Sequence, residues 1–273
     1  MMKDSSSHNK IQLLVTTVNL TNPLDLLKKL NVKSSFLIGN QTSYNSDEKL
    51  QYNNFEGVVV NRDERGVGIN RNNLINHSDC DICILSDDDM EFVDNYPEIV
   101  LKAFSDNKDA DAIIFNIGEK EKVRRQNTKS KKLSIFNYMN YGAARLAFRR
   151  ESVILKGISF NTMFGGGCQF SCGEDSLFIR ECLRKGLKII ALPVTIASLL
   201  DDRESSWFKG YSDKFVFDQG VFLALAHPLL CRLFAFLLCL KHPEYYKGYS
   251  TFWKALMQYN KGITYVKRRL YVC

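Results

Sequence analysis

An apolar run that ends in three consecutive aspartates constrains this chain more than any other feature of its sequence. Residues 82–85 have the length and composition of a buried β-strand, and the acidic cluster of Asp87, Asp88 and Asp89 follows one residue later. Ligands in open α/β sheets bind at the carboxyl edge of the strands, where this cluster would lie. Adjacent carboxylates repel one another unless solvent or a cation compensates them. The run therefore indicates a ligand-binding edge, or alternatively an acidic turn that caps the next helix.

Similar short apolar runs alternate with helical segments along the first two thirds of the chain. We expect strands at 12–18, 35–38, 57–60, 81–85, 112–115, 141–148 and 187–192. Helices are expected at 23–30, from about 68 onwards, and at 174–183. This alternation predicts an α/β fold with a mostly parallel central sheet and helices on both faces. The charged stretch 119–132 has no periodicity and is expected to be an exposed loop.

Length and composition suit one catalytic domain with a helical appendage. The chain has 273 residues, of which 45% are hydrophobic and 25% charged, so core formation is not in question. We expect a disordered N-terminus at 1–10, without the apolar segment of a secretory signal, a catalytic domain at 11–210 and a helical region at 211–273. The eight cysteines include a single CxxC, at Cys80 and Cys83, which indicates reduced thiols in a cytosolic protein rather than a zinc site.

The C-terminal region begins with twenty largely apolar residues, 221–240, whose strongly polar members are His227 and Arg232. This length could span a bilayer. However, Pro228 and Arg232 near its middle disfavour a span, because arginine is costly in hydrocarbon. A helix that packs on the domain or lies in a membrane interface is expected instead. The lysines and aromatic residues that follow suit a lipid headgroup region, and a packed tail with solvated charges is the alternative.

Two further motifs combine glycines with charged residues. Gly165, Gly166 and Gly167 precede Glu174 and Asp175, which begin a predicted helix. Glycines let a backbone approach a ligand closely, although acids at a helix N-terminus are favourable simply through the helix dipole.

The other motif places two glycines, Gly66 and Gly68, before or at the start of a helix that carries Arg71. A cation there could meet a phosphate at the helix start. The glycine spacing differs from that of the dinucleotide-binding fingerprint.

The order of these motifs resembles that of the inverting family 2 glycosyltransferases, which have the GT-A fold. The resemblance covers about residues 11–210 and rests on the helix with Arg71, the strand that ends in the acidic cluster, and the later Gly173-Glu174-Asp175. It implies transfer of a sugar from a nucleotide-diphosphate donor, a UDP-sugar, to a hydroxyl of a glycan acceptor. It further implies surface polysaccharide synthesis with a polyprenyl-diphosphate-linked acceptor, in the cytoplasm or peripherally on the inner face of the cytoplasmic membrane, and no nucleic-acid partner.

The resemblance also assigns roles to single residues. It implies that Asp87 and Asp89 hold Mn²⁺ or Mg²⁺, with Asp88 as the alternative if the register is shifted by one. Asp175 would be the general base, and Glu174 beside it would contact the acceptor. The implied contacts to the nucleotide-sugar come from Thr16, Thr17, Asn40, Arg71, Asp87, Asp88 and Gly166.

This sequence departs from the family pattern at two places. Asn40 stands where the family often has an aspartate that contacts the uracil ring, and an amide can also pair with an imide edge. No histidine follows the last core strand, where many members have a metal ligand, so either Asp201 or Asp202 substitutes for it or the metal has fewer protein ligands. The segment 205–210 resembles one near the active site of bacterial polysaccharide members.

Two other functions would use these features differently. A nucleotidyltransferase acting on sugar phosphates would need a glycine-rich loop near the first strand, and residues 18–22 contain no glycine. A non-catalytic nucleic-acid-binding protein would use the basic residues in 120–132 and at the C-terminus, and the net charge is +7. This second alternative leaves both acidic motifs without a purpose.

Overall fold

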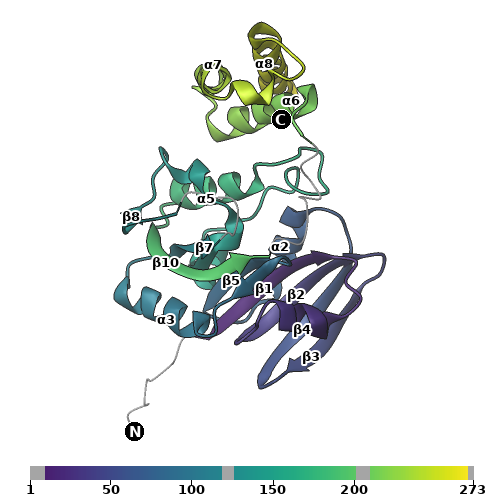
Figure 1. Ribbon diagram of the computed structural model, residues 1–273, viewed down its shortest axis with the longest axis vertical. Coiled ribbons are helices and arrows are strands. Elements are labelled where there is room, and N and C mark those ends of the chain that lie inside the picture. The colour runs from purple at the N-terminus through teal and green to yellow at the C-terminus, as the bar shows by residue number, and fades with distance from the viewer. Residues whose placement is uncertain (1–9, 119–125, 201–209, 270–273) are drawn as a thin grey trace.

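The structure is a computed structural model that describes residues 10–118, 126–200 and 210–269. One ten-stranded sheet occupies the centre, with the strand order β3-β4-β2-β1-β5-β9-β7-β10-β6 and with β8 paired to β10 (Figure 1). The strands are β1 (Ile11–Val18), β2 (Ser35–Thr42), β3 (Ser46–Tyr52), β4 (Phe55–Asp63), β5 (Ile82–Asp87), β6 (Met90–Phe92), β7 (Ala112–Gly118), β8 (Lys131–Lys132), β9 (Leu146–Arg149) and β10 (Ile189–Leu199).

Eight α-helices are present in the described residues. They are α1 (Pro23–Lys29), α2 (Val67–His77), α3 (Tyr96–Asp106), α4 (Arg150–Leu155), α5 (Glu174–Arg184), α6 (Asp213–Ala226), α7 (Cys231–Lys241) and α8 (Phe252–Arg269). Three short 3-10 helices, η1 (Tyr138–Asn140), η2 (Ala143–Arg145) and η3 (Pro243–Tyr245), lie in the connections.

Helices cover both faces of the sheet, as the apolar pattern predicts. Along β1, Leu13 and Val15 point to the face that α1 and α3 cover, whereas Leu14 points to the face that α2 and α5 cover. This division follows from the period of two in a strand, which sends successive side chains to opposite faces. Because β1 is buried on both sides, apolar residues occupy the successive positions Leu13, Leu14 and Val15 instead of alternating with polar ones.

The α/β class is confirmed, but the sheet is mixed rather than mostly parallel. Strands β4, β2, β1 and β5 run parallel to one another, and β7 runs parallel to β10. The remaining five pairings in the described residues are antiparallel, and β9 runs against both β5 and β7. The apolar patterns also do not predict β3, β6, β8, α3 or α4. Strand β3 is a polar edge strand joined to β4 by a two-residue turn at Asn53, so it has no apolar run that would reveal it.

The expectation of a single helix over 221–240 is wrong. Helix α6 ends at Ala226, and α7 begins only at Cys231. Pro228 lacks a backbone N–H and disfavours helical geometry in the residue before it. His227 accordingly lies outside the helical region, with φ −138° and ψ 66°. No helix in the described ranges is both long and apolar enough to cross a membrane.

The three C-terminal helices form a core of their own at the opposite end of the molecule from β3 (Figure 1). Phe164 and Phe170, from the segment that precedes α5, belong to the same core. Helices α6 and α8 cross closely, because glycine occupies the contact on both helices. A Cβ at Gly262 would overlap the carbonyl oxygen of Phe217, and one at Gly220 would overlap that of Tyr259.

This close crossing predicts that Gly262→Ala destabilises the protein. Glycine to alanine in an exposed helix interior usually stabilises by about 1 kcal/mol. Here the added methyl group meets backbone, so we expect a loss of about 1–3 kcal/mol in the free energy of unfolding, measured by chemical denaturation. Gly248→Ala is the control, since a Cβ at Gly248 has no neighbour within 4 Å. A stabilised Gly262→Ala variant would show that the two helices are not in close contact.

Candidate active site

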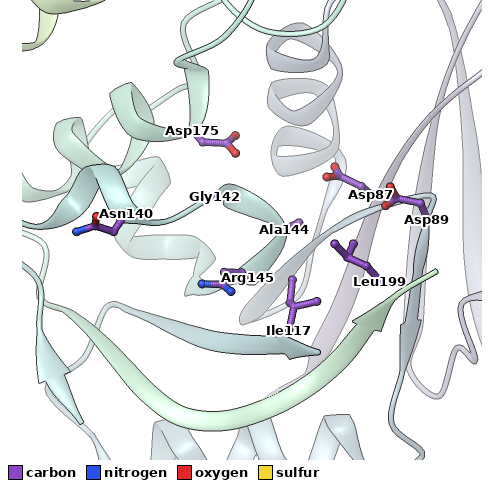
Figure 2. A pocket seen from close by; sticks show the side chains of 9 residues that line it. All are labelled: Asp87, Asp89, Ile117, Asn140, Gly142, Ala144, Arg145, Asp175 and Leu199. Carbon is purple, nitrogen blue, oxygen red and sulfur yellow. The ribbon is translucent and has the colours of Figure 1, made fainter. Parts of the chain in front are cut away.

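A cavity of about 280 Å³ lies at the carboxyl ends of several central strands (Figure 2). Strand β5 contributes Asp87, β7 contributes Ile117, and β10 contributes Leu199. Asp175 lies on one side of the cavity, and Asp87 and Asp89 lie on the other. The full lining consists of Asp87, Asp89, Ile117, Asn140, Gly142, Ala144, Arg145, Asp175 and Leu199. Two motifs that are far apart in the sequence therefore meet at one site.

Two threonines at the end of β1 hold the acidic cluster. The parallel pairing of β1 with β5 places Thr16 opposite Asp87. The Thr16 hydroxyl donates to Asp87 Oδ1 at 3.2 Å, and the Thr17 hydroxyl donates to Asp88 Oδ2 at 2.7 Å. Both threonines are buried. These hydrogen bonds orient two of the three carboxylates before any ligand is present.

Asp89 occupies an environment that suits a cation. Its Oδ1 is buried and has no hydrogen-bond partner within the described residues. Burial, together with the charges of Asp87 and Asp88, raises the pKa of Asp89. A hard divalent cation such as Mn²⁺ or Mg²⁺ would relieve this repulsion and is matched by carboxylate oxygens. The described parts of the chain contain no group of three His, Cys, Asp or Glu side chains that would complete a metal site, so Asp87 and Asp89 would supply only part of the coordination.

Arg71 connects the two sides of the site. Its side chain is 4% exposed, and its guanidinium donates to Asp175 Oδ1 at 2.6 Å and to Asp87 Oδ1 at 2.9 Å. The guanidinium also lies over the ring of Phe160, at 5.2 Å from the centroid. Burial by itself lowers the pKa of Arg71, but the charges of Asp175, Asp87 and Glu174 outweigh this effect and raise it. The arginine that the sequence associates with a phosphate is thus paired with carboxylates in this structure.

Asp175 lies in the first turn of α5 and lines the cavity. Arg71 donates to its Oδ1, and the backbone N–H of Ala143 donates to its Oδ2 at 2.8 Å. These two contacts fix the orientation of the carboxylate. Its side chain remains 27% exposed, so it is accessible from the cavity.

Glu174 points elsewhere and is packed beneath the glycine-rich segment. Its Oε2 accepts from the backbone N–H of Gly173 at 3.1 Å, and its Oε1 lies 3.8 Å from Arg71 Nη1. Burial and the charge of Asp175 raise the pKa of Glu174 to about 7. Gly165, with φ +101°, passes directly over it, and a Cβ there would come within 2.7 Å of Glu174 Cδ. A glycine is therefore required at 165 by both conformation and space.

Of the residues expected to contact the donor, Asp87 lines the cavity, whereas the others do not: Thr16, Thr17, Asn40, Arg71, Asp88 and Gly166. The Nδ2 of Asn40 donates to Asn61 Oδ1 at 2.7 Å, and its Oδ1 accepts from the N–H of Leu20 at 2.9 Å. The carbonyl of Gly166 accepts from the N–H of Val67 at the start of α2. Both residues are thus engaged in holding local structure, and their contacts to a donor remain predictions.

The sequence patterns do not predict four cavity residues that come from one segment: Asn140, Gly142, Ala144 and Arg145. They lie in or beside η1 and η2, where a continuous strand over 141–148 was expected, and only β9 at 146–149 is a strand. The available signal in the sequence was Arg145, a charged residue inside an apolar run, and the structure shows that this arginine is buried. The expected ligands Asp201 and Asp202, the segment 205–209 and the basic residues of 120–125 lie outside the described residues. Leu200, the last described residue before 201–209, lies beside the acidic cluster, because its N–H donates to the carbonyl of Asp89 at 2.8 Å.

The raised pKa of Glu174 predicts a pH-dependent effect of Glu174→Gln. The folded state holds this proton more tightly than the unfolded chain, whose glutamate pKa is near 4.5, so stability falls as the pH rises from about 4.5 to about 7. Glutamine removes the cost of ionisation. Relative to wild type, the variant should therefore gain on the order of 2–3 kcal/mol more at pH 8 than at pH 5, measured by urea unfolding.

Glu181→Gln is the matched control on the same helix. Hydrogen bonding to Arg184 lowers the pKa of Glu181, so this variant should lose a little stability at both pH values. An effect of Glu174→Gln that does not change with pH would contradict the assignment.

Solved structures with similar folds were found for nearly the whole chain. One is TarS 1–349 of S. aureus in complex with UDP-GlcNAc, with a TM-score of 0.60, 13% identity, and coverage of 95% of this chain and 92% of that chain. The same protein in complex with UDP gives a TM-score of 0.59, 15% identity, and coverage of 95% and 91%. The mannosyltransferase PcManGT of Pyrobaculum calidifontis, in complex with GDP-Man and Mn²⁺, gives a TM-score of 0.51, 13% identity, and coverage of 97% and 76%. These likenesses show that the chain has the GT-A fold.

The sequence itself identifies the family. No protein of curated function matches it. The model of glycosyl transferase family 2 matches residues 43–185, which is more than half of the chain and includes the acidic cluster, Arg71, Glu174 and Asp175. The chain is therefore a glycosyltransferase that belongs to glycosyl transferase family 2.

Proposed function

We propose that this glycosyltransferase moves a sugar from a UDP-sugar to a hydroxyl group of a glycan acceptor, with inversion at the anomeric carbon and with dependence on Mn²⁺ or Mg²⁺. The observation that carries this proposal is the single cavity lined by Asp87 and Asp89 on one side and Asp175 on the other. Arg71 holds the two sides together. A donor and an acceptor that meet in this cavity would have a cation-binding edge and a carboxylate base within one site.

The donor side is built around the acidic cluster. Asp87 and Asp89 would hold the cation, and Asp88 would contact the nucleotide-sugar. The cation would neutralise the charge of the diphosphate. Bound UDP-GlcNAc and UDP in TarS, and bound GDP-Man with Mn²⁺ in PcManGT, support a nucleotide-sugar donor. The hydrogen bonds from Thr16 and Thr17 would keep the cluster oriented when the donor enters, and further donor contacts are proposed for Asn40, Arg71 and Gly166.

The acceptor side depends on Asp175. We assign to it the role of general base, which takes the proton from an acceptor hydroxyl as that oxygen attacks the anomeric carbon. The nucleoside diphosphate leaves from the opposite face, so the configuration inverts. Arg71 and the N–H of Ala143 occupy one hydrogen-bonding direction on each carboxylate oxygen and aim the group into the cavity. Glu174 does not line the cavity and lies beside Arg71, so the contact to the acceptor that we propose for it stays a prediction.

The acceptor that we propose is a polyprenyl-diphosphate-linked glycan used in surface polysaccharide synthesis. The enzyme would then work in the cytoplasm, peripherally on the inner face of the cytoplasmic membrane. The support for a membrane location is the position of α6, α7 and α8. These helices share a core with Phe164 and Phe170, which belong to the segment that leads to Asp175. The catalytic domain would comprise 11–210, and the helical region at 211–273 would carry the membrane-facing surface.

Donor screening followed by product analysis tests the proposed reaction. A panel of nucleotide-sugars is assayed for Mn²⁺-dependent turnover, and a donor that raises the melting temperature identifies the base and sugar. The anomeric configuration of the first product is then read by NMR before it can equilibrate. Inversion is expected. A product of retained configuration, or full turnover in the presence of a chelator, would overturn the mechanism.

Substitutions at the two sides of the cavity should have different effects. Asp175→Asn keeps the size of the side chain but removes the base, and should lower kcat by about 10² to 10⁴ while UDP binding in Mn²⁺ persists. Asp89→Ala should abolish divalent-dependent UDP binding, measured by calorimetry, and leave the fold intact. Asp109→Asn, at an exposed carboxylate far from the cavity, is the control for both. Unchanged kcat with a raised donor KM in Asp175→Asn would make Asp175 a binding residue.

A further inference from the structure

The outer face of α7 carries a stripe of large apolar side chains that the protein leaves exposed. Leu233, Phe236, Leu237 and Leu240 are 40% to 57% exposed, and the turn before the helix adds Leu230 and Leu229, the latter 97% exposed. Spacings of three and four residues place this stripe on one face of the helix. The opposite face, with Cys231, Ala235 and Cys239, is buried in the C-terminal core. The helix is therefore packed on one side and apolar on both.

The stripe continues onto the start of α8. The ring of Phe236 contacts that of Phe252 at 5.7 Å between centroids, and Phe252 contacts Trp253 at 5.1 Å. Trp253 is 73% exposed, and Met257, one turn later, is half exposed. We call this surface the apolar face; it consists of Leu229, Leu230, Leu233, Phe236, Leu237, Leu240, Trp253 and Met257. An apolar surface of this extent marks an interaction site.

The net positive charge of the protein lies in the same C-terminal region of the chain. Residues 219–273 contain eight lysines and arginines and one acid, Glu244, so they carry the entire formal net charge of +7, and the first 218 residues are neutral. Glu244 is paired with His242 at 2.7 Å. Helices α7 and α8 contain no acidic residue. Their exposed basic side chains near the apolar face include Arg232, Lys241, Lys254 and Lys261.

We propose that the apolar face inserts into the interface of a membrane that contains anionic lipids. An interfacial helix combines apolar side chains that reach the acyl boundary with cations that meet lipid headgroups, and tryptophan favours this depth. Charge complementarity selects the bilayer over a second copy of this chain. Two copies in contact through this face would bring their basic residues together without an acid to pair them, whereas an anionic bilayer supplies the opposite charge.

Helix α6 lies between the helices of the apolar face and the segment that precedes Asp175. A Cβ at Gly173 would meet the Phe222 ring of α6 at 2.8 Å, and Asp218 of α6 accepts from the N–H of Ser171 at 3.0 Å. Helix α6 therefore supports the backbone that leads into α5. The idea that attachment also concentrates a lipid-linked acceptor rests on the proposed function, but the attachment itself does not.

Vesicle sedimentation of the full chain tests the proposal. The protein should sediment with vesicles of phosphatidylcholine and phosphatidylglycerol, less with phosphatidylcholine alone, and less in high salt. The triple variant Leu233→Gln/Leu237→Gln/Leu240→Gln should lower the partition coefficient by about 1000-fold, because each of the three inserted leucines contributes about tenfold. Arg232→Gln/Lys241→Gln/Lys254→Gln should lower it on the order of 100-fold, about fivefold for each charge.

The matched control is Leu24→Gln/Leu155→Gln, which changes exposed leucines of α1 and α4 outside the apolar face and should leave binding unchanged. Equal binding to both kinds of vesicle, or an equal loss in the control, would overturn the proposal. A wild-type protein that is dimeric and does not bind vesicles, together with a monomeric leucine variant, would also overturn it. That result would indicate that a second copy of the chain covers the apolar face. Mn²⁺-dependent release of UDP from a UDP-sugar in water should persist in all these variants, so a failure of membrane binding is distinguishable from a failure of the proposed function.

Discussion

The guanidinium of Arg71 lies almost completely out of solvent and donates to Asp87 at the end of β5 and to Asp175 at the start of α5. Removing a cation from water costs several kcal/mol, which only well-placed carboxylates can offset. The carboxylates depend on the arginine in turn, because Asp87, Glu174 and Asp175 would otherwise repel one another in a partly buried site. This mutual dependence ties the acidic cluster to the first turn of α5.

The surrounding fold determines where this arginine lies. Helix α2, which carries Arg71, packs on the face of the sheet formed by β1 and β2, next to the strand that presents the acidic cluster. Glycines at the start of α2 and in the segment before α5 allow the two backbones to approach. Gly165 passes over Glu174 and beside Val67, and Gly166 accepts a hydrogen bond from the N–H of Val67. The close contact between these segments brings residues 71 and 175 within hydrogen-bonding distance.

The C-terminal helices extend this arrangement away from the sheet. Their core includes Phe164 and Phe170, so these helices pack against the segment that leads into α5. The electrostatic character changes along the same direction. The first 218 residues are neutral overall with a concentration of acids at the cavity, whereas the last 55 carry all of the net positive charge. An acidic cavity and a basic C-terminal region are thus separated within one chain.

Local patterns in the sequence determined the α/β class and the central strands, because buried strands require apolar runs. Asp87 and Asp89 stand out at the polar end of one such run, and Asp175 follows a glycine-rich segment at the start of a predicted helix. The break at His227 is local as well, because it results from Pro228 within an otherwise apolar run. Two features depended on tertiary contacts instead: the polar edge strand β3 has no apolar signal of its own, and the mixed strand directions follow from how distant segments pair. The partners of Arg71 were likewise undetermined by sequence, since a helix start with an arginine suits a phosphate as well as a carboxylate. Only the folded chain, by placing residues 71, 87 and 175 side by side, decided which of these the guanidinium contacts.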